Sequence, residues 1–206
     1  MALTTYSDLK TSIANYLARS DLTSQIPDFI QLAEVRLRRE LRIRQMLKVA
    51  TTTTTGGDAT VGLPTDFLEL RDIFFVNDPS ITVMYMTPST FTRNARTTES
   101  GKPVNYTILS AEFQFAPIPD NTYTIQMLYY AAPTFLSDSV STNVFLQQCP
   151  DALLYAALGE AEPYLMNDAR LQTWGALYNR AVAALTAADE AGEFSASPLK
   201  MTLSVR

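Results

Sequence analysis

The 206-residue sequence contains no histidine, a single cysteine and only seven glycines. Without histidine, neither a Ser-His nor a Cys-His nucleophile pair can form, and the usual zinc ligand sets are missing. Cys149 has no second cysteine with which to form a disulfide inside the chain. None of the glycines belongs to a phosphate-binding loop of the P-loop or dinucleotide kind. We therefore expect no catalytic residues, no metal site and no cofactor.

Carboxylate or lysine chemistry is the route that these absences leave open. Asp66 lies close to Glu69 in the sequence, and Glu160 lies close to Glu162. Both pairs are explained more simply as solvated charges or helix-end residues than as a general acid and base. The sequence predicts a protein that is not an enzyme.

Long apolar runs are also lacking. No window reaches the length of a membrane span, and the start, MALTTYSDLKTSIANYL, has no charged beginning followed by an apolar run. Neither secretion nor membrane insertion is expected.

The charge distribution is uneven along the chain. The sequence has 16 basic and 21 acidic residues, and the stretch 33–48, AEVRLRRELRIRQMLK, holds six of the former and two of the latter. The remainder, with 10 basic and 19 acidic residues, carries −9. A body of that charge repels a DNA duplex, so general affinity for nucleic acid is not expected. A nucleic-acid-binding regulator that uses the basic stretch is the alternative function.

Two helices are predicted before residue 49. Helical spacing of apolar residues marks 6–18, with Thr5 or Ser7 as the N-cap. Pro27 and Asp28 suit the first turn of a second helix, which we expect to run through the basic stretch to about Lys48.

The second helix has an apolar face and a basic face on the helical wheel. The basic face gathers Arg38, Arg39 and Arg42, which we expect to meet acidic residues of another protein chain. A solvated face, with Glu34 and Glu40 paired to arginines four residues away, is the other interpretation.

From Val49 to Val140 the sequence favours an antiparallel β region, because segments rich in Val, Ile, Phe, Tyr and Thr alternate with turn residues. The strands are expected near 67–76, 81–86, 104–109, 112–116 and 122–131. Ser110 and Ala111 suit a tight hairpin.

Helices are predicted again after Cys149. Pro150 opens the first, which should kink or end near Pro163, and Asn167 or Asp168 caps the second. The two should form a hairpin, with Gly192 as the C-terminal stop. The expected packing seam of the second helix is Leu171, Trp174, Tyr178, Ala181, Leu185 and Ala188.

The final segment, residues 193–206, reads EFSASPLKMTLSVR and alternates apolar with polar residues, which is typical of an extended chain with one apolar face. We expect it to dock on another chain, or else to add an edge strand to its own β region. The docking residues would be Phe194, Leu199, Met201, Leu203, Val205 and Arg206.

Taken together, the sequence predicts an α+β protein. Residues 1–48 and 149–192 should form a helical bundle of two N-terminal and two C-terminal helices. Residues 49–148 should form a central antiparallel β barrel or sandwich, and 193–206 an extended docking tail.

The order of several segments resembles the head-to-tail adaptor proteins of tailed phages, relatives of the podoviral tail tubular protein A. The segments are IPDFIQLAEVRLRRELR, LPTDFLELRDIFF, GKPVNYTI, FQFAPIPD, IQMLYYAAPTFLS and CPDALLYAALGEAEPYL, followed by a helix that contains tryptophan. The resemblance implies a virion protein that forms a ring of about twelve copies at the head-to-tail junction. Its partners would be the portal protein above and the tail nozzle or tube below, with genomic DNA passing through the channel. The resemblance also implies that the tail 193–206 reaches the portal or a neighbouring subunit, and that Arg38, Arg39 and Arg42 meet acidic residues of an adjacent subunit or the portal.

Overall fold

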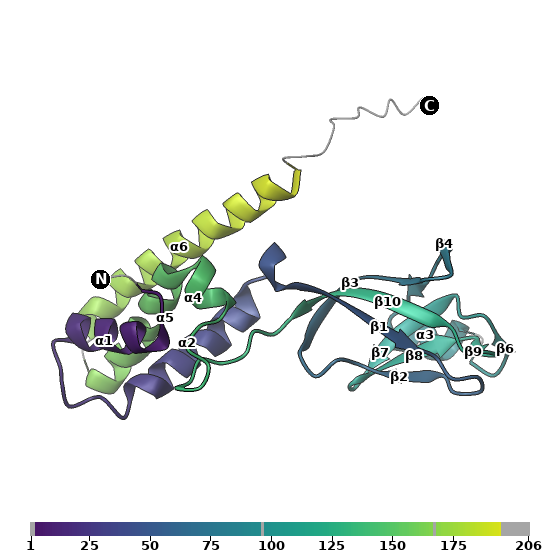
Figure 1. Ribbon diagram of the computed structural model, residues 1–206, viewed down its shortest axis with the longest axis horizontal. Helices are drawn as coiled ribbons and strands as arrows, with labels where there is room; N and C mark the ends of the chain where they lie inside the picture. Colours follow the sequence, from purple (N-terminus) through teal and green to yellow (C-terminus); the bar gives the residue numbers. More distant parts are fainter. Residues whose placement is uncertain (1–2, 96, 167, 195–206) are drawn as a thin grey trace. The chain divides into compact units, whose positions relative to one another are not determined.

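The computed structural model describes residues 3–95, 97–166 and 168–194 (Figure 1). The chain divides into two compact units: a helical unit of residues 1–46 and 133–206, and a sheet unit of residues 47–132. The protein is mixed α+β, which confirms the fold class predicted from the sequence. The region expected to be β, 49–148, differs from the sheet unit because residues 133–148 lie in the helical unit.

The first helix, α1 (Tyr6–Leu17), begins as its sequence indicates. Thr5 is the N-cap: its hydroxyl accepts from the Asp8 amide at 3.2 Å, and the Asp8 carboxylate accepts from the Thr5 amide at 3.0 Å. This reciprocal capping box satisfies two amides that the first turn leaves unpaired. The helix buries Tyr6, Leu9 and Ile13 on one face.

The second helix, α2, spans Ile26–Glu40 and is shorter than expected. The prediction that it continues to Lys48 was wrong, because Leu41 is extended, with φ −98° and ψ 137°. The following sequence, LRIR, alternates, and an extended chain lets both Leu41 and Ile43 be fully buried. A 3-10 turn, Arg44–Met46, completes the segment.

Three helices complete the helical unit: α4 (Val144–Gln148), α5 (Pro150–Leu165) and α6 (Asp168–Phe194). α5 is central, because it packs against α1, α2, α4 and α6, and its apolar residues are buried on nearly all sides. It ends two residues after Pro163, as predicted. α5 and α6 lie side by side, which confirms the predicted hairpin (Figure 1).

Two expectations for α6 were wrong. The helix passes through Gly192 to Phe194, and the glycine serves a different purpose: the Arg44 guanidinium occupies the space that a Cβ would need. Of the predicted seam, Tyr178 is fully buried, whereas Leu171 and Ala188 are exposed. α6 has 27 residues and α5 only 16. The apolar row of α6 therefore cannot pack against α5 along its whole length.

The sheet unit contains two four-stranded sheets and a small one. The first sheet has the order β1 (Leu47–Thr53), β10 (Thr124–Ala131), β3 (Phe67–Phe75) and β4 (Asp78–Thr82). The second has the order β2 (Thr60–Gly62), β8 (Glu112–Ala116), β7 (Asn105–Leu109) and β5 (Met84–Tyr85). β6 (Ser100–Gly101) pairs with β9 (Ile118–Pro119), and a short helix, α3, spans Pro88–Asn94.

The core of the sheet unit joins residues from both four-stranded sheets. Its members are Val61, Ile73, Phe75, Val83, Tyr106, Phe113, Phe115, Ile125, Met127 and Tyr129. Phe67 stacks on Tyr129 and meets Phe113 edge to face, so the two sheets share aromatic contacts. The arrangement corresponds to the sandwich alternative, and no closed barrel forms among the described strands.

The predicted strands near 67–76, 104–109, 112–116 and 122–131 are present, and Ser110 and Ala111 form the expected tight turn between β7 and β8. The strand expected at 81–86 is divided into β4 and β5. β1, β2, β6, β9 and α3 were not predicted, and neither was α4 of the helical unit.

Candidate interaction surfaces

One acidic residue of α2, Glu34, lies one helical turn before Arg38 and is buried. Glu34 is only 1% exposed, and its carboxylate accepts from the Leu136 amide at 3.1 and 3.2 Å. The Asn143 side chain donates to the same carboxylate at 2.5 Å. Burial raises the pKa of Glu34, and these hydrogen bonds oppose that rise. Glu34 thus holds the segment that returns from the sheet unit against α2.

Arg38 lies one turn further along α2 and is committed to the same returning segment. Its guanidinium lies 3.4 Å from the centre of the Phe135 ring and donates to the Pro133 carbonyl. Burial lowers the pKa of Arg38, while the nearby Glu34 acts in the opposite direction. A cation stacked on an aromatic ring and bonded to a carbonyl stabilises the unit internally.

The other two arginines have different environments. Arg42 donates to the carbonyls of Arg38 at 2.8 Å and Leu41 at 2.7 Å, so its side chain satisfies acceptors at the C-terminal end of α2. Arg39 is exposed, and no described residue forms a hydrogen bond or ion pair with it. The structure therefore does not bring Arg38, Arg39 and Arg42 together on one solvent-facing patch. Of the three, Arg39 is exposed and has no partner among the described residues.

Arg39 lies beside a shallow hollow of about 440 Å³ between α2 and α5. The hollow is lined by Leu32, Val35, Arg36, Arg39, Glu40 and Glu160. Leu32 is 51% exposed and adds apolar area to the rim of this hollow. Sequence reasoning missed Leu32 and Val35, although their spacing of three residues on the side of α2 that carries Arg36 and Arg39 was a visible signal.

A second cleft, of about 220 Å³, adjoins this hollow and shares Arg36 and Glu160 with it. Its walls are aromatic: Tyr155 of α5 stacks on Trp174 of α6, with ring centroids 6.2 Å apart. The Arg36 guanidinium lies 4.1 Å from the centre of the Tyr178 ring. The two lining glycines, Gly159 and Gly175, face open space.

Trp174 anchors this cleft through a buried carboxylate. Its indole N–H donates to Glu162 at 2.8 Å, and Glu162 is only 1% exposed. The second carboxylate oxygen of Glu162 has no hydrogen-bond partner among the described residues. Trp174 itself is half-buried, so it borders the surface instead of lying fully in the core as expected.

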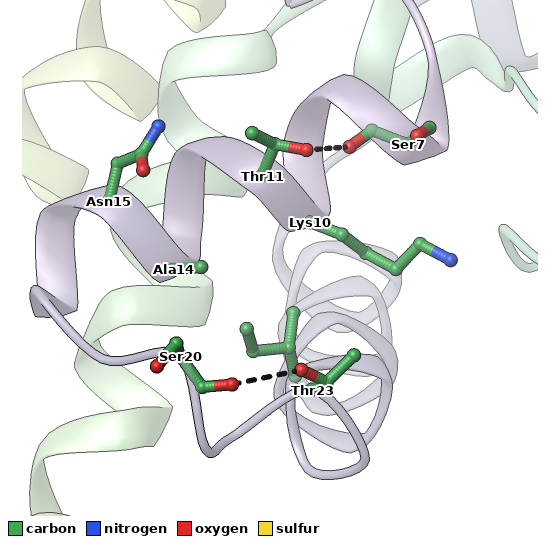
Figure 2. Close-up of a pocket in the computed structure, with 8 residues that line it drawn as sticks. Ser7, Lys10, Thr11, Ala14, Asn15, Ser20 and Thr23 are labelled. Atoms are coloured by element: carbon green, nitrogen blue, oxygen red, sulfur yellow. Dashed lines mark hydrogen bonds between the residues drawn. The ribbon is translucent and has the colours of Figure 1, made fainter.

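A groove beside α1 has ordinary structural chemistry (Figure 2). It measures about 370 Å³ and is lined mainly by small polar residues of α1 and of the loop to α2. Thr11 donates to the Ser7 carbonyl at 2.9 Å, and Thr23 donates to the Ser20 carbonyl at 3.2 Å, as Figure 2 shows. Both threonine hydroxyls therefore donate to carbonyls of the nearby backbone.

Two of the carboxylates considered for catalysis, Asp66 and Glu162, have structural partners. Asp66 accepts from Lys48 at 2.7 Å and from the Tyr129 hydroxyl at 2.8 Å, and the bond from Lys48 lowers the pKa of Asp66. In the parts of the chain that the structure describes, no group of three or more potential ligands could hold a metal ion. No described helix is long and apolar enough to cross a membrane.

The docking residues predicted in the tail cannot be placed. Phe194 is the last residue of α6, and its side chain is not described. The remaining five, Leu199, Met201, Leu203, Val205 and Arg206, lie outside the described residues.

The model of the SU10 adaptor protein family matches residues 4–202 of the sequence. The chain therefore belongs to this family of phage adaptor proteins, which confirms the resemblance to phage adaptors. The relation to podoviral tail tubular protein A stays a prediction. No curated protein matches the sequence.

Proposed function

We propose that the protein is a head-to-tail adaptor that forms a ring between the portal and the tail nozzle or tube of a phage particle. The observation that carries this proposal is the family match, which spans nearly the whole chain. A structural role also accords with the partners found for Asp66, Glu162 and Glu34, each of which is bound to its own chain.

The hollow beside Arg39 is the subunit contact that we favour within such a ring. It combines an exposed leucine, Leu32, with an arginine that is unpaired among the described residues and an acidic rim at Glu160. Arginine is enriched in protein interfaces, and head-to-tail contacts between identical subunits form a ring when the rotation between neighbours closes. Arg38 and Arg42, which were also predicted for the interface, would act by shaping α2.

The DNA passes through the ring without being held. Outside residues 33–48 the chain carries −9, and within that stretch Arg38, Arg42 and Arg44 are already engaged by their own chain. An acidic channel wall lets a duplex slide because it offers few cations to the phosphates. These contacts also make the alternative, a regulator that binds DNA through 33–48, the weaker hypothesis.

The test is assembly on the portal protein of the same phage. Purified wild-type protein mixed with portal should give rings of defined copy number, counted by electron microscopy and native mass spectrometry. Arg39→Glu should lower the affinity for neighbouring subunits by at least about tenfold, as expected for an interfacial charge reversal. Circular dichroism should remain unchanged, because Arg39 is exposed.

Arg180→Glu is the matched control, since Arg180 is exposed on α6 and lies outside the hollow. It should assemble like the wild type. A wild-type protein that forms no ring and does not bind portal would contradict the proposed function. Equal assembly by Arg39→Glu and the wild type would contradict only the proposed subunit contact at Arg39 and would leave the adaptor function standing.

A further inference from the structure

The sheet unit has one long open edge, β1. The two four-stranded sheets end in β1, β4, β2 and β5, which have 7, 5, 3 and 2 residues. β1 pairs with β10 in an uninterrupted antiparallel register from Leu47 to Thr53, and no described strand pairs with its other side.

β1 lacks the features that protect edge strands from pairing with other chains. Such features are prolines, bulges, free charges and short length. β4 contains Pro79, and its pairing with β3 is interrupted by a register shift. β2 and β5 are too short to accept a long strand. β1 has no proline and no register shift, and its one charge, Lys48, is held by Asp66 at 2.7 Å.

The outward backbone groups of β1 follow from its register. The Thr54 amide donates to the Tyr123 carbonyl at 2.9 Å, so in the alternating antiparallel pattern Thr52 and Ala50 also face β10. The amides and carbonyls of Val49 and Thr51 therefore point away from the sheet, as do those of Thr53. Among the described residues none of these outward groups has a hydrogen-bond partner. The Val49 side chain is 54% exposed.

We propose that β1 accepts, as an added strand, residues 199–205 of a second copy of this chain. This segment, LKMTLSV, has the same seven-residue length as β1 and places its apolar residues on alternate positions. Four residues, 195–198, precede it after the end of α6, and in extended form they span about 13 Å. Main-chain hydrogen bonds supply the affinity of such an added strand, and alternate side chains supply its specificity.

An antiparallel register centred on both segments pairs Val49 with Leu203 and Thr51 with Met201. The apolar row of the added strand then covers the exposed Val49 and the threonine methyl groups beside it. This inference rests on the self-association in the proposed function, and it names the acceptor for the tail.

The first experiment removes one outward amide. Thr51→Pro deletes a donor that points away from β10, a position at which an edge strand tolerates proline. It should weaken self-association about tenfold or more, as expected when a main-chain hydrogen bond is lost and its acceptor stays unpaired. A chain ending at Phe194 should show the same loss. Thr51→Val keeps the amide and should associate like the wild type in sedimentation velocity.

The second experiment does not depend on how Thr51→Pro folds. Two single variants, Thr51→Cys and Met201→Cys, are mixed and oxidised, and the linked peptides are identified by mass spectrometry. They should form a disulfide between chains, whereas Thr51→Cys mixed with Lys200→Cys, whose side chain would point to the other face, should not. The native Cys149 is buried and is the same in all samples.

The outcomes separate this inference from the proposed function. If Thr51→Pro assembles on the portal with unchanged affinity and no cross-link forms, the β1 inference is wrong and the adaptor function stands. A cross-link that forms only inside one chain carrying both cysteines, at high dilution, overturns the second copy as the source of the strand. If the wild type neither self-associates nor binds portal, the proposed function is wrong, and the β1 inference that rests on it is wrong as well.

Discussion

Neighbouring residues of α2 have opposite environments. Arg38 is stacked on Phe135, while the next residue, Arg39, is exposed beside an open hollow. Successive residues of a helix point about 100° apart, so one faces the returning segment and the other faces solvent. For this reason a combined charge reversal of the arginines would mix a folding defect with an assembly defect, and Arg39 alone is the informative position.

Glu34 should make stability depend on pH. Its folded-state pKa is raised by burial above the ordinary value of 4.5. Its contribution to stability is therefore fully present below that value and is lost as the pH rises through the folded-state pKa. The free energy of unfolding of the wild type, relative to that of Glu34→Gln, should therefore fall as the pH rises from 4.5 through the folded-state pKa of Glu34. Urea titrations at a series of pH values measure this difference.

Glu190→Gln is the control for that series, because Glu190 is exposed on α6. Its stability should run parallel to that of the wild type over the same pH range. Parallel curves for Glu34→Gln as well would mean that Glu34 is solvated in the folded protein.

Trp174 should stabilise the helical unit through both its ring and its N–H. Trp174→Ala removes the stack on Tyr155 and the donor to Glu162, whose carboxylate is buried. We expect a loss of about 3 kcal/mol in the free energy of unfolding, measured by chemical denaturation. Trp174→Phe keeps a ring without the N–H and should lose about 1 to 2 kcal/mol. A loss below about 0.5 kcal/mol in Trp174→Ala would show that the side chain is effectively on the surface.

At the scale of elements, glycine has two different roles within α6. Gly175 faces open space in the aromatic cleft, whereas the place of a Cβ at Gly192 is filled by the Arg44 guanidinium. Arg44 in turn binds Asp189 through its backbone amide at 3.1 Å and its Nε at 3.0 Å. This clasp ties the segment after α2 to the far part of α6.

Gly175→Ala should therefore stabilise the protein by about 0.5 to 1 kcal/mol, since alanine costs less conformational entropy than glycine in a helix and meets nothing there. Gly192→Ala is the matched comparison in the same helix. It should gain less or lose stability, because the new methyl group displaces Arg44 from Asp189. Thermal unfolding of both variants measures the difference, and an equal gain at both positions would contradict the clasp.

At the scale of the whole molecule, the charge balance should prevent DNA binding by the free protein. The local excess of four positive charges in 33–48 is opposed by −9 elsewhere, and three of its arginines are engaged by their own chain. We expect no retardation of duplex DNA in a gel at about 150 mM salt. Tight binding with a steep dependence on salt would contradict the structural role and support the regulator.

Much of the fold followed from local signals. The Thr5 cap, the paired helices after Cys149 and the turn at Ser110 depend on residues within a few positions of one another. Periods of 3.6 and 2 report such local order directly. The candidate site was less predictable: Arg39 was among the residues named, but Leu32, Val35 and the aromatic cleft were not.

Sequence patterns alone predict the mixed α+β class, most of the helices and strands, and an unequal charge distribution. The end of α2 at Glu40, the burial of Glu34 and the internal use of Arg38 depend instead on how distant segments pack together. The partners of Glu34 lie 102 and 109 positions away along the chain. A wheel or a spacing rule contains only short-range information, whereas the burial of a charge depends on which distant segment folds against it.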